Sequence, residues 1–144
     1  MKNLLAALTV LFLSQLAWGG NSCISNATGF DSCKAAREFA DDMATSLPMK
    51  MNKNMTIEKV FAIQNMVSLT VVLNYTEEYL KSVLVQNGTT SQELKAQMLK
   101  AVTTNSCQAG SHTALFIRSG VRLQYVYFFS DGVKYTTLNI DKCE

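Results

Sequence analysis

The stretch TIEKVFAIQNMVSLTVVLNY, residues 56–75, decides the fold because it predicts two β-strands joined by a turn. β-Branched and aromatic residues, which favour strands, dominate both halves of the stretch. Leu69, Val71 and Leu73 fall at every second position, the period of a strand with one buried face. A turn near residues 64–65 separates the halves, so the stretch predicts a β-hairpin.

A second hairpin is predicted at the end of the chain, in GVRLQYVYFFSDGVKYTTLNIDKCE, residues 120–144. Two strand-like runs flank Asp131 and Gly132, and an Asp-Gly pair between such runs is a strong hairpin signal. Alternate residues of the first run share one face, which we expect to be buried. They are Val121, Leu123, Tyr125 and Tyr127.

Four segments have the three- and four-residue spacing of amphipathic helices. The first begins at Asp31 or Ser32, either of which can cap it, and ends before Pro48, because a proline disfavours helix at the preceding residue. Thr90 and Glu93 match the capping-box pattern at the start of the third. The expected helices cover residues 32–47, 76–85, 91–107 and 111–119, with Gly120 ending the last.

Strands and helices therefore come in blocks rather than in strict alternation. This order predicts an α+β fold, in which a mainly antiparallel sheet of four to five strands is covered by helices. We expect one domain, since the chain has 144 residues and neither an internal repeat nor a low-complexity linker.

The first 19 residues are typical of a signal peptide. Lys2 gives a basic start, an apolar run follows, and Ala17 and Gly19 place small residues at the −3 and −1 positions for cleavage. The apolar run is shorter than the roughly 20 residues of a membrane span. We expect residues 1–19 to be removed and residues 20–144 to form a periplasmic domain, or a secreted one if the source lacks an outer membrane.

The chain has four cysteines, Cys23, Cys33, Cys107 and Cys143. An even number in an exported chain predicts disulfides, and four cysteines allow three pairings. We favour Cys23 with Cys33, which closes a short loop, and Cys107 with Cys143, which closes a longer one. There is no Cys-x-x-Cys motif, and His112 is the only histidine, so no metal site and no cofactor are expected.

The composition argues against nucleic acid as a partner and against catalysis. Removing Lys2 leaves 12 basic side chains (13 − 1) against 11 acidic ones, without the basic excess that phosphate binding requires. Nucleophilic catalysis needs a base beside an activated serine or cysteine. The four thiols are expected in disulfides, and no serine-hydrolase motif occurs. We therefore interpret His112 as a solvated residue at the start of a helix, and we expect the protein not to be an enzyme.

From residue 39 to Cys143 the layout resembles the small pilotins of bacterial type II secretion systems. The shared outline is a helix, Leu47-Pro48, two strands, a helix ending at Cys107 and a short apolar helix, then Gly120, a hairpin and a closing cysteine. The resemblance implies a sheet covered by helices and a bond between Cys107 and Cys143. It also implies a role in assembling a secretion machine.

The sequence departs from that family at its expected cleavage site. Pilotins of this kind are lipoproteins whose first mature residue is a lipid-bearing cysteine. Here the first cysteine, Cys23, follows Gly20-Asn21-Ser22, which does not resemble a lipobox.

We therefore expect a non-enzymatic protein that binds another protein. The first hypothesis is an immunity-type inhibitor of a periplasmic effector such as a cell-wall hydrolase, because a small rigid chain loses little entropy on binding. The alternative is a pilotin-like assembly factor whose partner is a subunit of a secretion or pilus machine. A homodimer through an open sheet edge is also possible. The residues expected to meet the partner are polar: Glu77, Glu78, Gln92, Glu93 and Gln97.

Overall fold

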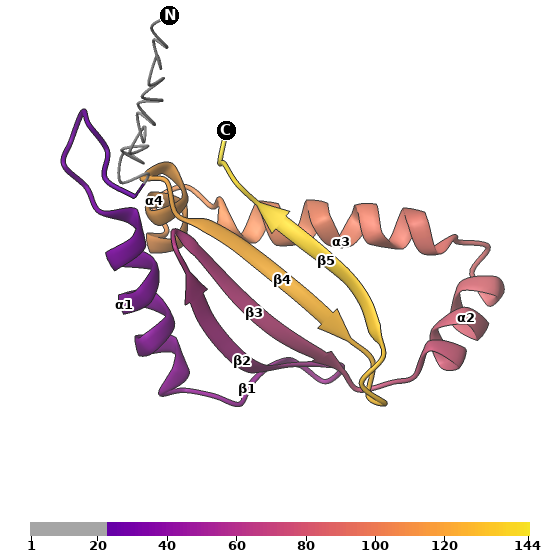
Figure 1. Ribbon diagram of the computed structural model, residues 1–144. Helices are drawn as coiled ribbons and strands as arrows, with labels where there is room; N and C mark the ends of the chain where they lie inside the picture. Colours follow the sequence, from indigo (N-terminus) through magenta and orange to yellow (C-terminus); the bar gives the residue numbers. More distant parts are fainter. Residues whose placement is uncertain (1–22) are drawn as a thin grey trace, which may run out of the picture.

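The computed structural model describes residues 23–144, so the predicted signal peptide, residues 1–19, lies outside the described residues. One sheet with helices packed on it forms the body of the protein (Figure 1). Its elements are α1 (Ser32–Ala44), β1 (Met49–Asn52), β2 (Met55–Ile63), β3 (Met66–Leu73), α2 (Glu77–Gln86), α3 (Ser91–Ser106), α4 (His112–Arg118), β4 (Arg122–Phe128) and β5 (Lys134–Ile140).

The five strands lie in the order β1-β2-β3-β4-β5. Neighbours are antiparallel except for β3 and β4, which are parallel. Parallel neighbours need a long crossover, and here residues 74–121, with α2, α3 and α4, return the chain to the end of the sheet where β3 began (Figure 1). The predicted α+β fold with a mainly antiparallel sheet is confirmed.

Local signals set the ends of the elements as the sequence predicted. The carboxylate of Asp31 accepts hydrogen bonds from the N–H groups of Cys33 and Lys34 at the start of α1. At the start of α3, the Thr90 hydroxyl accepts from the Glu93 N–H (3.2 Å) and the Glu93 carboxylate accepts from the Thr90 N–H (2.8 Å). Gly120 has a φ of 98°, which favours glycine after a helix.

One segment is more ordered than predicted. The strands expected from the sequence begin only at residue 56, whereas Met49–Asn52 forms the edge strand β1, which pairs with the first residues of β2. The first helix also ends earlier than expected, at Ala44, because Thr45 caps it with hydrogen bonds to the carbonyls of Asp42 and Met43.

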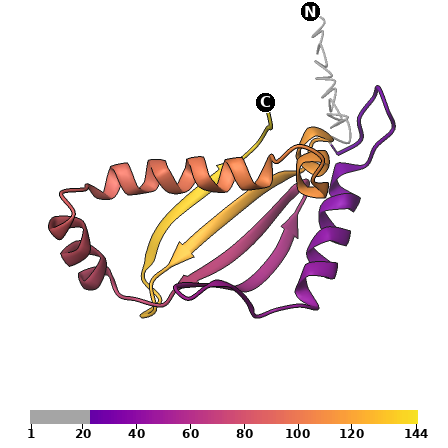
Figure 2. The ribbon, with the colours of Figure 1, turned by 180° about the vertical axis from the view of Figure 1, so that it is seen from behind.

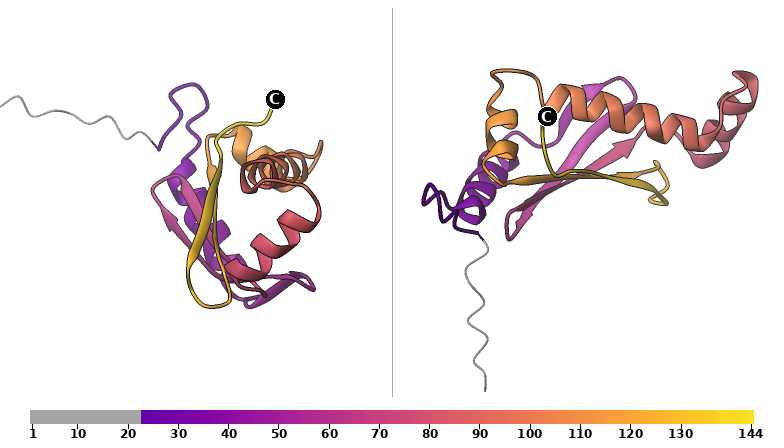
Figure 3. Two further views of the ribbon diagram at one scale, coloured as in Figure 1. Left: turned by 90° about the vertical axis from the view of Figure 1, so that its right-hand side faces the viewer. Right: turned by 90° about the horizontal axis from the view of Figure 1, so that it is seen from above.

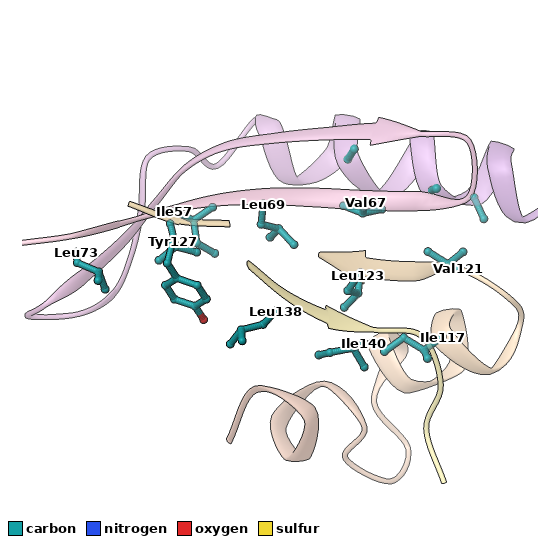
Figure 4. Close-up of a cluster of buried hydrophobic side chains, with 14 of the residues drawn as sticks. Ile57, Val67, Leu69, Leu73, Ile117, Val121, Leu123, Tyr127, Leu138 and Ile140 are labelled. Atoms are coloured by element: carbon teal, nitrogen blue, oxygen red, sulfur yellow. The ribbon is translucent and has the colours of Figure 1, made fainter. Parts of the chain in front are cut away.

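The core lies on one face of the sheet, which we call the inner face (Figure 4). Paired residues of neighbouring strands stack there: Val71 of β3 is beside Ile57 of β2 and Tyr127 of β4. These three side chains are at most 3 % exposed. The other buried strand residues of this face are Val67, Leu69, Leu73, Leu123, Leu138 and Ile140.

Helices pack on the inner face. α1 lies against β2 and β3 with its buried alanines, and α3 lies against β5 (Figure 3). Phe39 of α1 meets Phe116 of α4 edge-on, with ring centroids 5.4 Å apart. The small Ala36 and Ala40 let α1 approach the sheet closely, while α3 contacts mainly the far edge strand.

Two disulfides hold the ends of the described chain, in the pairing that the sequence favoured. Cys23 is bonded to Cys33 at the start of α1, with Cα atoms 5.2 Å apart. Cys107, at the end of α3, is bonded to Cys143 beyond β5, with Cα atoms 5.3 Å apart. The second bond ties α3 to the edge of the sheet that it covers.

Candidate functional site

A groove runs between helices α2 and α3 and the inner face of the sheet, near the turn from β1 to β2. It consists of two hollows of about 380 and 400 Å³. The hollows adjoin, because Asn54, Tyr75 and Leu94 line both. In Figure 2, α2 and the start of α3 extend beyond the strands, at the end of the sheet away from α1. The groove lies at this end.

The walls of the groove are mainly apolar. Met55 of β2 and Leu73 of β3 are neighbours in the sheet and form part of one wall. Leu94 and Met98, one turn apart on α3, form the opposite wall, and both are half-buried. Methionine is unbranched and polarisable, so it adapts to apolar groups of different shape. The remaining apolar lining comes from Leu80, Val83 and Leu84 of α2.

Aromatic rings close the end of the groove nearest α2. The ring of Tyr75 lies 5.8 Å from that of Tyr79 and 6.3 Å from that of Phe129, and Phe129 lies 5.1 Å from Tyr135. Burial, followed by the charges of Tyr135 and Tyr79, raises the pKa of Tyr75 above its usual value. Tyr75 lines both hollows of the groove.

The ammonium group of Lys95 lies above the Tyr135 ring, 5.1 Å from its centroid. This cation–π contact joins α3 to β5 beside the aromatic cluster. Ser91 of α3 and Tyr135 also approach each other, with hydroxyl oxygens 3.5 Å apart. These two contacts link the first half of α3 to β5 beside the groove.

The structure separates the five polar residues predicted to meet a partner. Only Gln97 lines the groove. Glu77 pairs with Lys81 (2.9 Å) along α2, and Glu93 is held by the α3 cap, where hydrogen bonds from Thr90 lower its pKa. The other two, Glu78 and Gln92, lie exposed. Contact of these five residues with a partner stays a prediction.

Sequence reasoning did not find the apolar walls. The amphipathic pattern predicts a helix over residues 91–107, and the apolar face of such a helix, which here includes Leu94 and Met98, is normally fully buried. The signal that was missed is spatial, since α3 rests on β5 and leaves part of that face over the groove.

The lining offers binding rather than acid–base or metal chemistry. Its titratable side chains are Tyr75, Tyr79 and Lys53, and no carboxylate or histidine is among them. Within residues 23–144, no three histidine, cysteine or acidic side chains gather as metal ligands. No helix in the same range has the length and apolar character needed to cross a bilayer.

No family model and no curated protein sequence matches the chain. Three solved structures do. The pilotin EpsS of the Vibrio vulnificus type 2 secretion system superposes with a TM-score of 0.58 at 12 % identity, over 76 % of this chain and 86 % of its own. The type II secretion system pilotin AspS of Vibrio cholerae superposes with a TM-score of 0.57 at 18 % identity, over 77 % of this chain and 89 % of its own.

The third structure is a protein of Pseudomonas aeruginosa described as secreted. It gives a TM-score of 0.55 at 12 % identity, over 76 % of this chain and 88 % of its own. At these identities the similarity establishes a shared fold. It confirms the resemblance to pilotins as one of architecture.

Proposed function

We propose that this protein is a pilotin-like assembly factor, which binds a secretin subunit of a secretion machine in the cell envelope. The observation that carries the proposal is an apolar groove, without catalytic groups among its lining residues, in a fold shared with two pilotins. An apolar hollow with few polar groups is the usual form of a binding site.

The groove is the proposed contact surface. Leu94 and Met98 are half-buried in the free protein and lose their remaining exposure when an apolar segment of the partner enters. Tyr75 and Gln97 supply hydrogen bonds at the rim. Buried apolar area provides most of the affinity, and the polar groups orient the segment.

The immunity-type inhibitor expected first from the sequence has no such support. None of the three solved structures is described as an immunity protein or an inhibitor. The comparisons favour the alternative, an assembly factor.

The disulfides suit the oxidising compartment that this function requires. The disulfides also limit where a lipid can be attached, because attachment to a cysteine needs its free thiol. The sulfur of Cys23 is bonded to Cys33, so in this structure Cys23 carries no lipid. The proposed function then needs another means of keeping the protein at the membrane.

The decisive experiment is affinity capture from the detergent-solubilised envelope of the source organism, with the bound proteins identified by mass. Met98→Asp places a charge in the groove wall. Leu99→Asp is the matched control, because Leu99 follows on the same helix and is 40 % exposed away from the groove.

A secretin captured by the native protein and by Leu99→Asp, and lost with Met98→Asp, supports the proposal. Capture of a hydrolase whose activity falls on binding would instead restore the immunity hypothesis. Circular dichroism and a non-reducing gel verify that both variants keep the fold and its two disulfides.

A further inference from the structure

The face of the sheet opposite the core, the outer face, has large apolar side chains in the open. Phe61 and Ile63 of β2 are 46 % and 53 % exposed. Figure 3 shows α2 and α3 together on one side of the sheet. The paired positions on the neighbouring strands continue the outer face with half-buried residues: Met66, Thr70, Val72, Val126 and Phe128.

Hydrogen bonds order the centre of this face. The Ser68 hydroxyl donates to the Gln124 amide oxygen (3.1 Å), and the Gln124 amide nitrogen donates to the Asn139 oxygen (3.1 Å). The three side chains form a ladder across β3, β4 and β5. The hydrogen bonds order the centre of the outer face, and a shallow hollow of about 310 Å³ lies beside Lys59, Thr70 and Val72.

The outer face is also cationic. The strands contain five charged residues, of which Glu58 alone is acidic. Their net charge of +3 (4 − 1) compares with +1 for residues 23–144 (12 basic − 11 acidic). The ion pairs of the described residues are both in helices, Lys34 with Glu38 and Lys81 with Glu77. The basic residues of the strands are Lys50, Lys59, Arg122 and Lys134.

The sheet register places these cations around the apolar centre. Lys59 lies beside Thr70, Arg122 beside Met66 and Lys134 beside Phe128. Lys50 lies beside Thr56, whose other neighbour, Val72, belongs to the outer face. Arg122 and Lys59 therefore lie toward the end of the sheet that holds Phe61 and Ile63, whereas Lys50 and Lys134 lie toward the other end, near Val72 and Phe128.

We propose that the outer face binds an anionic phospholipid surface. Exposed aromatic and aliphatic groups flanked by lysines are typical of segments that lie in the membrane interface, with the apolar groups inserted and the ammonium groups at the phosphates. A protein partner fits less well, because protein interfaces are depleted in lysine, and three of these four cations are lysines. A second copy fits least, since it would bring two sets of four cations together.

Membrane binding here and partner binding in the groove use opposite faces of one sheet. Met55 and Leu73 line the groove from the inner face, whereas Phe61 and Lys59 belong to the outer face. The protein can therefore hold a partner while it rests on the bilayer. This arrangement would supply the membrane attachment that Cys23 does not.

The test is co-sedimentation of the purified, oxidised protein with vesicles of phosphatidylglycerol and phosphatidylethanolamine, compared with phosphatidylcholine vesicles. We expect binding to the anionic vesicles alone, weakening as salt is added. Each lysine contributes about fivefold in affinity, so Lys50→Gln/Lys59→Gln/Lys134→Gln should weaken binding about 100-fold.

The matched control is Lys34→Gln/Lys100→Gln/Lys142→Gln, which removes the same charge away from the outer face and should leave binding nearly unchanged. The Phe61→Ser/Ile63→Ser variant tests how much the apolar side chains contribute to vesicle binding. Its control is Val85→Ser, because the Val85 side chain is 81 % exposed on α2. The Met98→Asp variant should bind vesicles as the native protein does. Vesicle binding and partner binding in the groove can therefore succeed or fail independently of each other.

Four results would overturn the inference. The first is equal binding to phosphatidylcholine, and the second is an equal loss in the two triple variants. The third is binding to poly-glutamate with none to vesicles, which would identify an acidic protein as the occupant. A concentration-dependent dimer in sedimentation velocity that the Phe61→Ser/Ile63→Ser variant abolishes would likewise assign the face to a second copy.

Discussion

Tyr127 of β4 lies beside Val71 of β3 in the parallel strand pair, and its side chain is only 2 % exposed. Burial, followed by the neighbouring Tyr125, raises the pKa of Tyr127 to about 12. An ordinary phenol loses its proton near pH 10. Tyr127 therefore keeps its proton in the folded protein over a range in which the unfolded chain has lost it.

Stability should fall between pH 10 and 12 for this reason. The pKa is higher in the folded state, so the stabilisation is complete below about pH 10 and is lost as the pH rises toward 12. The loss attributable to Tyr127 is on the order of 2 kcal/mol. Urea unfolding at pH 8 and at pH 11.5 measures it, and Tyr127→Phe should show a smaller difference between the two. An identical difference in both proteins would contradict the assignment.

Loss of the bond between Cys107 and Cys143 should cost more stability than loss of the other disulfide. The two bonds close loops with sequence separations of 36 and 10 residues. In the chain-entropy model they contribute about 4 and about 3 kcal/mol, respectively. Urea midpoints of Cys107→Ser/Cys143→Ser and Cys23→Ser/Cys33→Ser test this order. The reverse order would show that native contacts, rather than loop closure, decide the effect.

Leu69→Ala should destabilise the fold strongly. Leu69 is 2 % exposed at the centre of β3, and removing a buried leucine side chain costs about 2–5 kcal/mol. Leu115→Ala is the matched control, since Leu115 is 53 % exposed on α4, and we expect a change within about 0.5 kcal/mol. Thermal unfolding of both variants is the measurement. Similar melting temperatures would mean that the centre of β3 is not the core.

Thr90→Ala should raise the pKa of Glu93 part of the way to its usual value. Two hydrogen bonds from Thr90 lower that pKa, the larger from the backbone N–H and the smaller from the hydroxyl. The substitution removes only the hydroxyl, so a lowered pKa should remain. NMR titration of the Glu93 carboxyl in the native protein and in the variant measures the shift. An unchanged pKa would show that the Thr90 hydroxyl does not donate to the Glu93 carboxylate in solution.

Hairpins, caps and the fold class could be predicted because each depends on residues close together in the chain. Asp131-Gly132 predicts its turn by the backbone conformations it allows, and Thr90 with Glu93 predicts a helix start by hydrogen bonds across one turn. These signals act before any tertiary contact forms. The alternation of Leu69, Val71 and Leu73 likewise predicts the buried face of β3, and all three are buried.

The binding surfaces could not be predicted in this way, because each joins segments that only the folded sheet brings together. The groove combines Met55, Leu73 and Met98, and the outer face combines Lys50 with Lys134 across the whole sheet. Nothing in the sequence states that β3 pairs with β4 in parallel. The polar residues singled out from the sequence are exposed on helices, but exposure alone does not define a contact surface.

The long crossover between β3 and β4 has a consequence for how the protein forms. The two central strands are neighbours in the sheet although residues 74–121 separate them in the chain. Contacts between distant segments slow folding, because the entropy of closing the loop is lost before the contacts compensate for it. Until residues 74–121 have folded, β3 lacks its neighbour β4 and presents an unpaired strand edge. During that interval, cross-pairing between chains competes with maturation, and high expression should favour aggregates.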